Sequence, residues 1–197
     1  MTRLAKFKER RASPKAGKAS DAPPPKRTAP LVLMDAAGFH TMDAIREFIQ
    51  YDLDGGAQTE WNERFVTPLC IAAISVDGLA QLANEPARDR LQALVGDTLK
   101  KLTRRADRLA KSGDDFVVLL RRTLSKKAHD FYAPNARKAI AEACGGGTSI
   151  CVGISSLTEH MVKGADDMLK KATSALAAAR KLGPGSTMVY DFRTMPY

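Results

Sequence analysis

The sequence lacks a disulfide framework, a zinc-ligand pattern and any long apolar run. Its three cysteines follow no framework spacing, and two of them, Cys70 and Cys151, lie inside apolar segments. We therefore expect buried, reduced thiols. The three histidines, His40, His129 and His160, are scattered and do not pair with the cysteines at zinc spacing, so no metal site is predicted from them. No run approaches the roughly 18 apolar residues that a membrane span needs.

The beginning of the chain is basic and has almost no large apolar residue after Phe7. Residues 1–30 contain nine Lys and Arg against two acids, so they carry +7 of the formal net charge of +9. A triple proline, Pro23–Pro25, and several Ala and Ser complete their composition. This composition predicts a disordered basic tail on residues 1–30. Because no apolar segment follows the basic start, we expect no secretory signal and a cytoplasmic protein.

Three interpretations of the basic tail stay open. It can serve only to keep the protein in solution. It can also bind an acidic protein partner, or a polyanion such as nucleic acid or an anionic membrane surface, through long-range attraction and counterion release. With a single aromatic residue in the tail, stacking on bases is poorly supported.

Residues 31–197 are nearly neutral and have the periodicity of one folded domain. The continuous apolar run 69–76 is typical of a central strand buried on both faces. From the spacing of apolar residues, helices are predicted after Thr41, after Pro86, after Ser125 as the cap with an interruption near Pro134, and over 165–182. Short strands are predicted at 150–154 and 187–191. The order predicts an α/β sandwich of the palm type, with helices covering a mostly antiparallel or mixed sheet.

A hairpin between two short strands contains the most informative residues. Ser112, Gly113, Asp114 and Asp115 lie between Arg108-Leu109-Ala110 and an apolar run that begins at Phe116. Asp and Gly at this position are typical of a tight turn. Two carboxylates at a hairpin tip can hold a divalent cation, and a glycine lets the backbone approach phosphates. An ordinary solvated acidic turn is the alternative interpretation.

Several short segments, in order, resemble the GGDEF domain of bacterial diguanylate cyclases from about Asp35 to Asp191. The hairpin Ser112–Phe116 resembles the segment that gives the family its name. The other similar segments are 35–42, 75–80, 151–154, 172–180 and 188–191. The resemblance covers about four fifths of the chain, and it implies the GGDEF palm-type fold. Members of the family join two GTP molecules, one on each subunit of a dimer, into cyclic di-GMP with a metal ion, so a homodimer is a further possibility here.

Carried over residue by residue, the resemblance places the first-strand metal acid at Ser75, which cannot replace a carboxylate against Mg²⁺. Asp114 matches the hairpin metal acid, Asp115 matches the usual Glu, and Gly113 is the glycine that remains, because Ser112 stands at the other glycine position. The phosphate-binding Lys becomes Arg180.

Further positions of the family are altered. Pro184 stands at a family Arg, and the loop before the second helix is about four residues shorter. The guanine-recognising residues would be Asn84 and Asp89, the former with a one-residue insertion. We therefore expect no catalysis, no resident metal, and Mg²⁺ only if GTP binding remains.

Arg104 and Asp107 have the Arg-x-x-Asp spelling of the family's product-inhibition site, which grips cyclic di-GMP. Only four residues separate this segment from Ser112, and a second family Arg is Asn135 here. The alternative is a helix C-terminus rich in Arg for dipole reasons, with Asp107 paired locally.

Three hypotheses for function follow. The leading one is a catalytically inactive GGDEF-like signalling module that acts through protein contacts, with cyclic di-GMP as a ligand at Arg104 and Asp107. The second is a residual diguanylate cyclase or GTP-binding domain using Asp114 and Asp115. The third is a polyanion-binding protein acting through residues 1–30.

Overall fold

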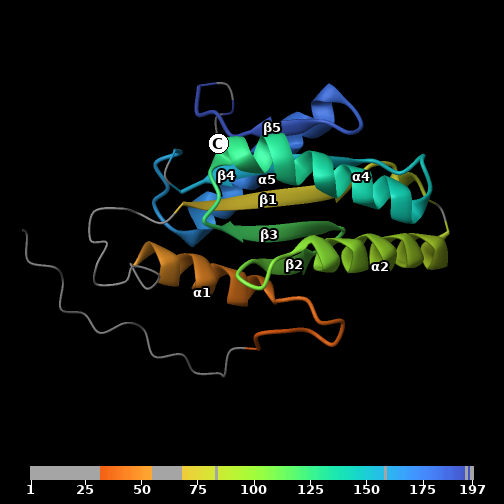
Figure 1. Cartoon of the computed structure of the whole chain (residues 1–197), viewed down its shortest axis with the longest axis horizontal. Coiled ribbons are helices and arrows are strands. Elements are labelled where there is room, and N and C mark those ends of the chain that lie inside the picture. Colours follow the sequence, from red (N-terminus) through yellow and green to blue (C-terminus); the bar gives the residue numbers. More distant parts are fainter. Residues whose placement is uncertain (1–31, 55–67, 83, 158, 194, 196–197) are drawn as a thin grey trace, which may run out of the picture. The chain divides into compact units, whose positions relative to one another are not determined.

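The computed structural model describes residues 32–54, 68–82, 84–157, 159–193 and 195. The predicted basic tail on residues 1–30 lies outside these residues. Within the described part the expected order of helices and strands is confirmed (Figure 1). The elements are α1 Met42–Leu53, β1 Leu69–Val76, η1 Leu79–Gln81, α2 Glu85–Leu102, β2 Arg108–Ser112, β3 Asp115–Arg121, α3 Ser125–Lys127, η2 Ala128–Tyr132, α4 Ala133–Cys144, β4 Ile150–Ser156, α5 Ala165–Leu182 and β5 Thr187–Val189.

The five strands form one mixed sheet in the order β2-β3-β1-β4-β5. β1 pairs antiparallel with both β3 and β4, and β2 pairs antiparallel with β3, whereas β4 and β5 run parallel. β1 is buried along its whole length, because helices cover both of its faces. The predicted α/β sandwich with a mostly antiparallel sheet is therefore confirmed.

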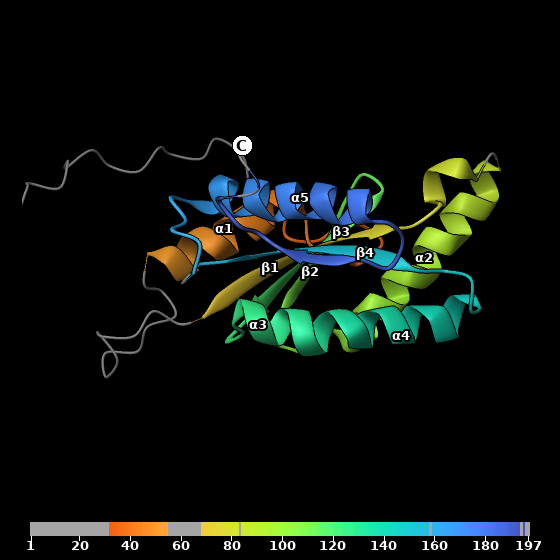
Figure 2. The ribbon, with the colours of Figure 1, turned by 90° about the horizontal axis from the view of Figure 1, so that it is seen from above.

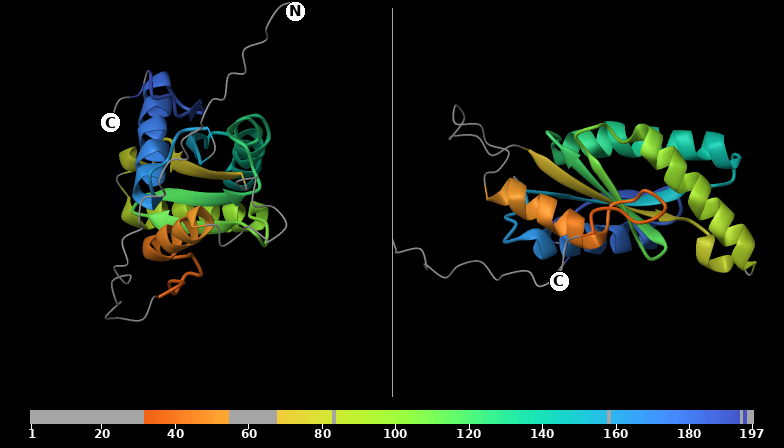
Figure 3. Two further views of the ribbon diagram at one scale, coloured as in Figure 1. Left: turned by 90° about the vertical axis from the view of Figure 1, so that its left-hand side faces the viewer. Right: turned by 90° about the horizontal axis from the view of Figure 1, so that it is seen from below.

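Alternate residues of β1 pack into two separate hydrophobic cores, one on each face of the sheet. α1 and α5 cover one face of the sheet, and α2 and α4 cover the other (Figures 2 and 3). Ile71 and Ala73 pack with buried residues of α1 and α5, while Ala72 and Ile74 pack with α2 and α4. Successive side chains of a strand point to opposite faces, so a single apolar run serves both layers. In the described part no helix has the length and apolar character required to cross a membrane.

The approach of α5 to β4 is close enough to require a glycine. A Cβ on Gly153 would lie 2.1 Å from the backbone nitrogen of Leu176 and 2.4 Å from the carbonyl oxygen of Ala172. Only a residue without a side chain fits between strand and helix at this distance. This close packing sets the position of the C-terminal half of α5, which carries Arg180.

Several details differ from the predictions. The helical segment begins with Leu124 at the N-cap rather than Ser125. The interruption predicted near Pro134 is a π-helical stretch, Ala128–Tyr132, and the proline itself lies in the first turn of α4. The last strand ends at Val189. Two leucines that fit the apolar periodicity of the predicted helices are exposed, Leu94 by 42% and Leu182 by 67%, because periodicity does not show where the packed surface ends.

Candidate functional site

The β2–β3 hairpin has a two-residue turn, Gly113-Asp114, between the paired residues Ser112 and Asp115. Gly113 has φ +61°, a conformation that L-residues rarely adopt. Nothing lies within 4 Å of a Cβ added there, so the backbone angle, not packing, requires this glycine. Ser112 ends strand β2 with no positive φ. The replacement of the family's other glycine is therefore tolerated.

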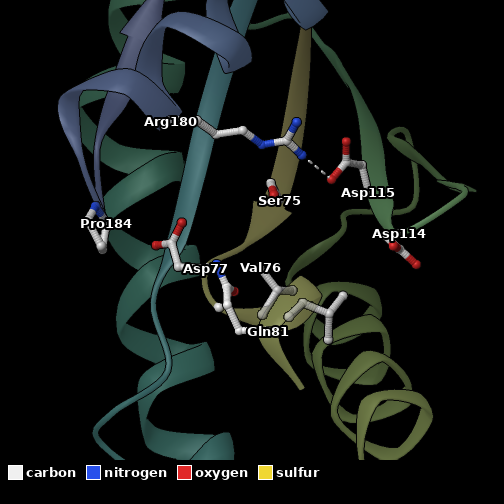
Figure 4. Close-up of a pocket in the computed structure, with 10 residues that line it drawn as sticks. Ser75, Val76, Asp77, Gln81, Asp114, Asp115, Arg180 and Pro184 are labelled. Atoms are coloured by element: carbon white, nitrogen blue, oxygen red, sulfur yellow. Dashed lines mark hydrogen bonds and ion pairs between the residues drawn. The ribbon is translucent and has the colours of Figure 1, made fainter. Parts of the chain in front are cut away.

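Beside this hairpin lies a pocket of about 460 Å³ (Figure 4). The end of β1 and the turn after it form its floor, the hairpin forms one wall, and the end of α5 forms another. Its lining residues are Ser75, Val76, Asp77, Gly78, Leu79, Gln81, Asp114, Asp115, Arg180 and Pro184. The structure thus brings together the four residues that the resemblance places in the catalytic site, Ser75, Asp114, Asp115 and Arg180.

The carboxylate of Asp114 is held by helix α2. Arg88 forms an ion pair with one of its oxygens, and the side-chain amide of Gln92 donates to the other at 3.0 Å. Arg88 and Gln92 are four residues apart and so lie on one face of the helix. Figure 4 shows Asp114 at the edge of the pocket, apart from Arg180 and Ser75.

The carboxylate of Asp115 is paired with Arg180. The guanidinium Nη2 of Arg180 donates to Oδ1 of Asp115 at 2.6 Å, across the mouth of the pocket (Figure 4). The phosphate-binding position that the resemblance assigns to residue 180 therefore has its charge neutralised by a neighbouring acid. Asp115 engages one nitrogen of this guanidinium, so a phosphate at this position would have to share Arg180 with a carboxylate that is also negatively charged.

The remaining acid in the pocket, Asp77, is also engaged. Its Oδ2 accepts a hydrogen bond from the Ser149 hydroxyl at 2.5 Å and from the Gly185 N–H at 2.8 Å. Ser75, the residue at the expected first metal position, is buried and uncharged. Asp77 keeps its charge, but these neutral donors hold its Oδ2 on the side of the pocket opposite Asp114 and Asp115 (Figure 4).

The oxygen atoms of this pocket do not fit a catalytic Mg²⁺, which prefers several oxygen ligands with negative charge. Each of the carboxylates in the pocket already holds a donor from the protein itself. Among the residues that the structure describes, no three His, Cys, Asp or Glu side chains are grouped so as to hold a metal ion.

The predicted guanine-recognising residues lie elsewhere. Asn84 is the N-cap of α2, and its side-chain oxygen accepts a hydrogen bond from the Ala87 N–H at 3.2 Å. Asp89 is exposed on the same helix. Neither residue lines the pocket. Asn84 thus has a local structural task, which an N-cap residue performs in most helices.

Arg104 and Asp107 form an ion pair with each other. The guanidinium of Arg104 contacts both oxygens of Asp107, at 2.8 and 3.2 Å, and also donates to Thr123 at 3.0 Å. The Asp107 side chain is only 1% exposed and accepts a further hydrogen bond from the Arg121 N–H at 3.0 Å. In the structure Asp107 is paired locally with Arg104, as the alternative interpretation of this motif predicts. A nucleotide base has no access to Asp107 in this arrangement.

The residues that sequence reasoning missed are Arg88 and Gln92. Their spacing on an amphipathic helix was visible, but nothing in the sequence indicated that this face of α2 lies against the hairpin tip. Gln81 and Asp77 were likewise not assigned to the pocket, although both follow the end of β1 within a few residues.

No protein-family model and no curated protein matches the sequence, but solved structures match the fold. The GGDEF domain of YfiN from Pseudomonas aeruginosa superposes with a TM-score of 0.67 at 19% identity, covering 79% of this chain and 98% of that one. The GGDEF domain of DgcB from Caulobacter crescentus, solved in complex with c-di-GMP, gives 0.64 at 12% identity over 83% and 99%. The diguanylate cyclase SiaD from Pseudomonas aeruginosa, in complex with its activator SiaC, gives 0.63 at 15% identity over 81% and 62%. The described part of this chain therefore has the fold of the GGDEF domains of diguanylate cyclases.

Proposed function

We propose that this chain is a catalytically inactive GGDEF-fold module of cyclic di-GMP signalling that acts by contacting protein partners. One observation carries the proposal. Every carboxylate of the pocket holds a donor from the protein, and the position expected for the first metal ligand is the neutral Ser75.

The chemistry of the family explains why this arrangement opposes catalysis. Attack of a 3′-hydroxyl on an α-phosphate needs negative charge to seat the activating cation and positive charge to stabilise the phosphates. Here Arg88 neutralises Asp114, and Asp115 neutralises Arg180. Loss of a single transition-state contact costs about 3 kcal/mol, or roughly a hundredfold in rate, and several such contacts are missing together.

The test of inactivity is direct. The purified full chain is incubated with GTP and either Mg²⁺ or Mn²⁺, and nucleotides are separated by chromatography. We expect no cyclic di-GMP above the level of the Asp114→Ala variant. Sustained product formation that disappears in Asp114→Ala would overturn the proposal and favour a residual cyclase.

Two of the structural relatives support a regulatory task, although at low identity. The SiaD structure contains an activator protein, and the DgcB structure contains c-di-GMP. Protein contact and cyclic di-GMP are therefore the two kinds of partner that the proposal includes.

For cyclic di-GMP the favourable observation is the exposure of Arg104, whose side chain is 55% accessible. Binding at this residue predicts an affinity, measured by titration calorimetry, that falls at least about tenfold in Arg104→Ala, because hydrogen bonds to a charged group are worth about 1.5–3 kcal/mol. Equal affinities of the two proteins would remove this site, and absence of binding would leave protein contact as the mode of action.

A further inference from the structure

The loops at one end of the domain expose basic and apolar side chains together. The loop after α2 and the loop after β3 lie side by side, because Arg104 donates to the carbonyl oxygen of Arg121 at 3.2 Å and to the hydroxyl of Thr123 at 3.0 Å. Among the exposed side chains of these loops and the adjoining helical segment, we call three cationic and two large apolar ones the α3 patch. It consists of Arg105, Arg122, Leu124, Lys127 and Phe131.

The charges of the α3 patch are uncompensated. Arg105, Arg122 and Lys127 are all exposed, and within the described part of the chain none of them forms an ion pair. Their neighbours differ in this respect, because Arg104 is paired with Asp107 and Lys126 with Asp130. The patch therefore offers positive charge to a partner rather than to its own domain.

Two large apolar side chains accompany these charges. Leu124 is 46% exposed and Phe131 is 63% exposed. Lys127 lies between them in the sequence, on the segment that runs from the N-cap of α3 into the π-helical stretch. A phenylalanine or leucine exposed next to arginines is typical of the centre of a protein interface, where aromatic residues and Arg are enriched.

The π-helical stretch Ala128–Tyr132 explains why Phe131 points outward. Ala128 and Ala133 are both buried, five residues apart, and the N–H of Ala133 bonds to the carbonyl of Ala128. In a regular α-helix the residues three and four positions after Ala128 would share its face, and Phe131 is one of them. The wider π turn rotates Phe131 away from the core. Such stretches occur frequently at functional sites.

Arg122 is held in an unfavourable backbone conformation. Its φ is +54°, in the left-handed region that glycine adopts without cost and that other L-residues avoid. A glycine would adopt this turn more easily. The exposed arginine side chain is therefore present although the backbone conformation of this position favours glycine. Strained residues of this kind cluster at functional positions.

We infer that the α3 patch docks an acidic segment of a partner protein that carries at least one large apolar side chain. The positive charges of the patch favour acidic residues in the partner. The exposed side chains of Leu124 and Phe131 favour a large apolar residue beside them. The patch fits a membrane surface less well, because the outward positions that follow on α4, Asn135, Lys138 and Glu142, are polar, whereas a helix that lies on a membrane needs a long apolar face. The inference rests on the proposed function only in taking protein contact as the mode of action.

The test uses a peptide-display library selected against the immobilised full chain. Binders are depleted on the double variant Lys127→Glu/Phe131→Ser, so that peptides held by other surfaces, including the tail, are removed. We expect the remaining peptides to share Asp or Glu residues around a large apolar residue. The affinity of a selected peptide, measured by fluorescence anisotropy, should fall at least about tenfold in the double variant, which is 1.4 kcal/mol. The matched control, Lys181→Glu/Leu182→Ser, changes a lysine and a large apolar residue in the same way at the exposed end of α5 and should leave the affinity unchanged.

Arg122→Gly separates a binding task from a structural one. Because glycine relieves the positive φ, the melting temperature of this variant should equal or exceed that of the wild type, while peptide affinity falls. A merely structural arginine would show no loss of affinity.

Two outcomes would overturn the inference. One is the absence of an acidic consensus, or an affinity that is the same in the double variant and the control. The other is patch-dependent retention of single-stranded DNA or phosphatidylserine vesicles without peptide binding, which would assign another class of partner. The peptide selection and the anisotropy measurement contain no GTP. Cyclase activity would therefore refute the proposed function while leaving a positive peptide result intact.

Discussion

The guanidinium of Arg88 in α2 pairs with the carboxylate of Asp114 at the tip of the β2–β3 hairpin. Gln92, one turn further along the helix, donates to the other carboxylate oxygen at 3.0 Å. Helix α2 therefore holds both oxygens of the acid that the resemblance assigns to a metal ion. In this domain the hairpin acid anchors the hairpin to a helix.

Removal of this anchor should loosen the hairpin while the fold survives. In Arg88→Ala we expect faster amide hydrogen exchange along residues 111–116 and a loss of about 0.5 kcal/mol in unfolding free energy, since a half-exposed ion pair contributes little. Hydrogen-exchange mass spectrometry and urea unfolding measure the two effects. Arg90→Ala is the control, because Arg90 is exposed on the same helix and forms no ion pair in the described part of the chain. Equal exchange in both variants would show that Asp114 is not an anchor.

Restoring the missing acid alone should not restore metal binding. Ser75→Asp places a carboxylate at a buried position and should cost about 2 kcal/mol of stability, while Asp114 and Asp115 remain paired with arginines. Combined with Arg88→Ala, which frees Asp114, it should create a Mn²⁺ site that electron paramagnetic resonance detects. Ser75→Asn with Arg88→Ala is the isosteric neutral control. Mn²⁺ binding by Ser75→Asp alone would contradict the view that the arginines block the site.

Asp107 should prove a structural residue. Its carboxylate accepts hydrogen bonds from the backbone N–H groups of Arg104 and Arg121 and from the Arg104 guanidinium. Asp107→Ala removes the shared acceptor of two backbone N–H groups and the partner of the Arg104 guanidinium, so a loss of about 3 kcal/mol in unfolding free energy is expected. Asp97→Ala, which removes an exposed partner of Lys100, should cost less than about 0.5 kcal/mol. A similar small cost for both variants would mean that Asp107 is available to a ligand.

Gly153 should tolerate no side chain. An added Cβ would lie 2.1 Å from the Leu176 backbone nitrogen, so α5 and β4 would have to separate. We expect Gly153→Ala to destabilise the fold by about 3 kcal/mol or to prevent folding. Gly146→Ala, where nothing lies within 4 Å, should change stability by less than about 0.5 kcal/mol. Thermal unfolding followed by circular dichroism compares the two, and equal melting temperatures would contradict the close packing.

Burial raises the pKa of the Cys70 thiol to about 12, and the thiol donates to the Thr123 carbonyl at 2.9 Å. Because the folded state holds this proton more tightly than the unfolded chain, the stability from Cys70 is complete below the unfolded pKa of about 9 and is lost as the pH rises from there towards 12. We expect the wild type to lose up to about 1.4 kcal/mol per pH unit more than Cys70→Ala in this range. Urea unfolding at a series of pH values tests this, and parallel curves for the two proteins would refute it.

The order of elements and the buried strand β1 were predictable because both rest on local periodicity. The run Leu69–Val76 is a strand with the predicted bounds, and α5 begins at Ala165 and ends at Leu182 as predicted. Thr41 caps α1 as expected, accepting a hydrogen bond from the Ala44 N–H. Exposure of Leu182 was not predictable, because the extent of the surface against which α5 packs depends on other parts of the chain.

The membership of the candidate site was predictable in part. Ser75, Asp114, Asp115 and Arg180, which the similar segments single out, line one pocket, because the order of elements determines which strand ends meet. The electrostatic state of these residues was not predictable. Asp114 meets Arg88 only because α2 crosses beside the hairpin tip, and no local pattern relates positions 88 and 114.

By itself the sequence determined the α/β architecture, the glycine at the hairpin and the neutral serine at position 75, where the resemblance implies an acid, since each depends on residue type and spacing along the chain. Only the tertiary structure decided that the remaining acids hold arginines and hydrogen-bond donors, that Arg104 and Asp107 bind each other, and that Phe131 faces outward. Ion pairs and burial depend on distances between residues far apart in the chain, and those distances exist only after the layers have packed.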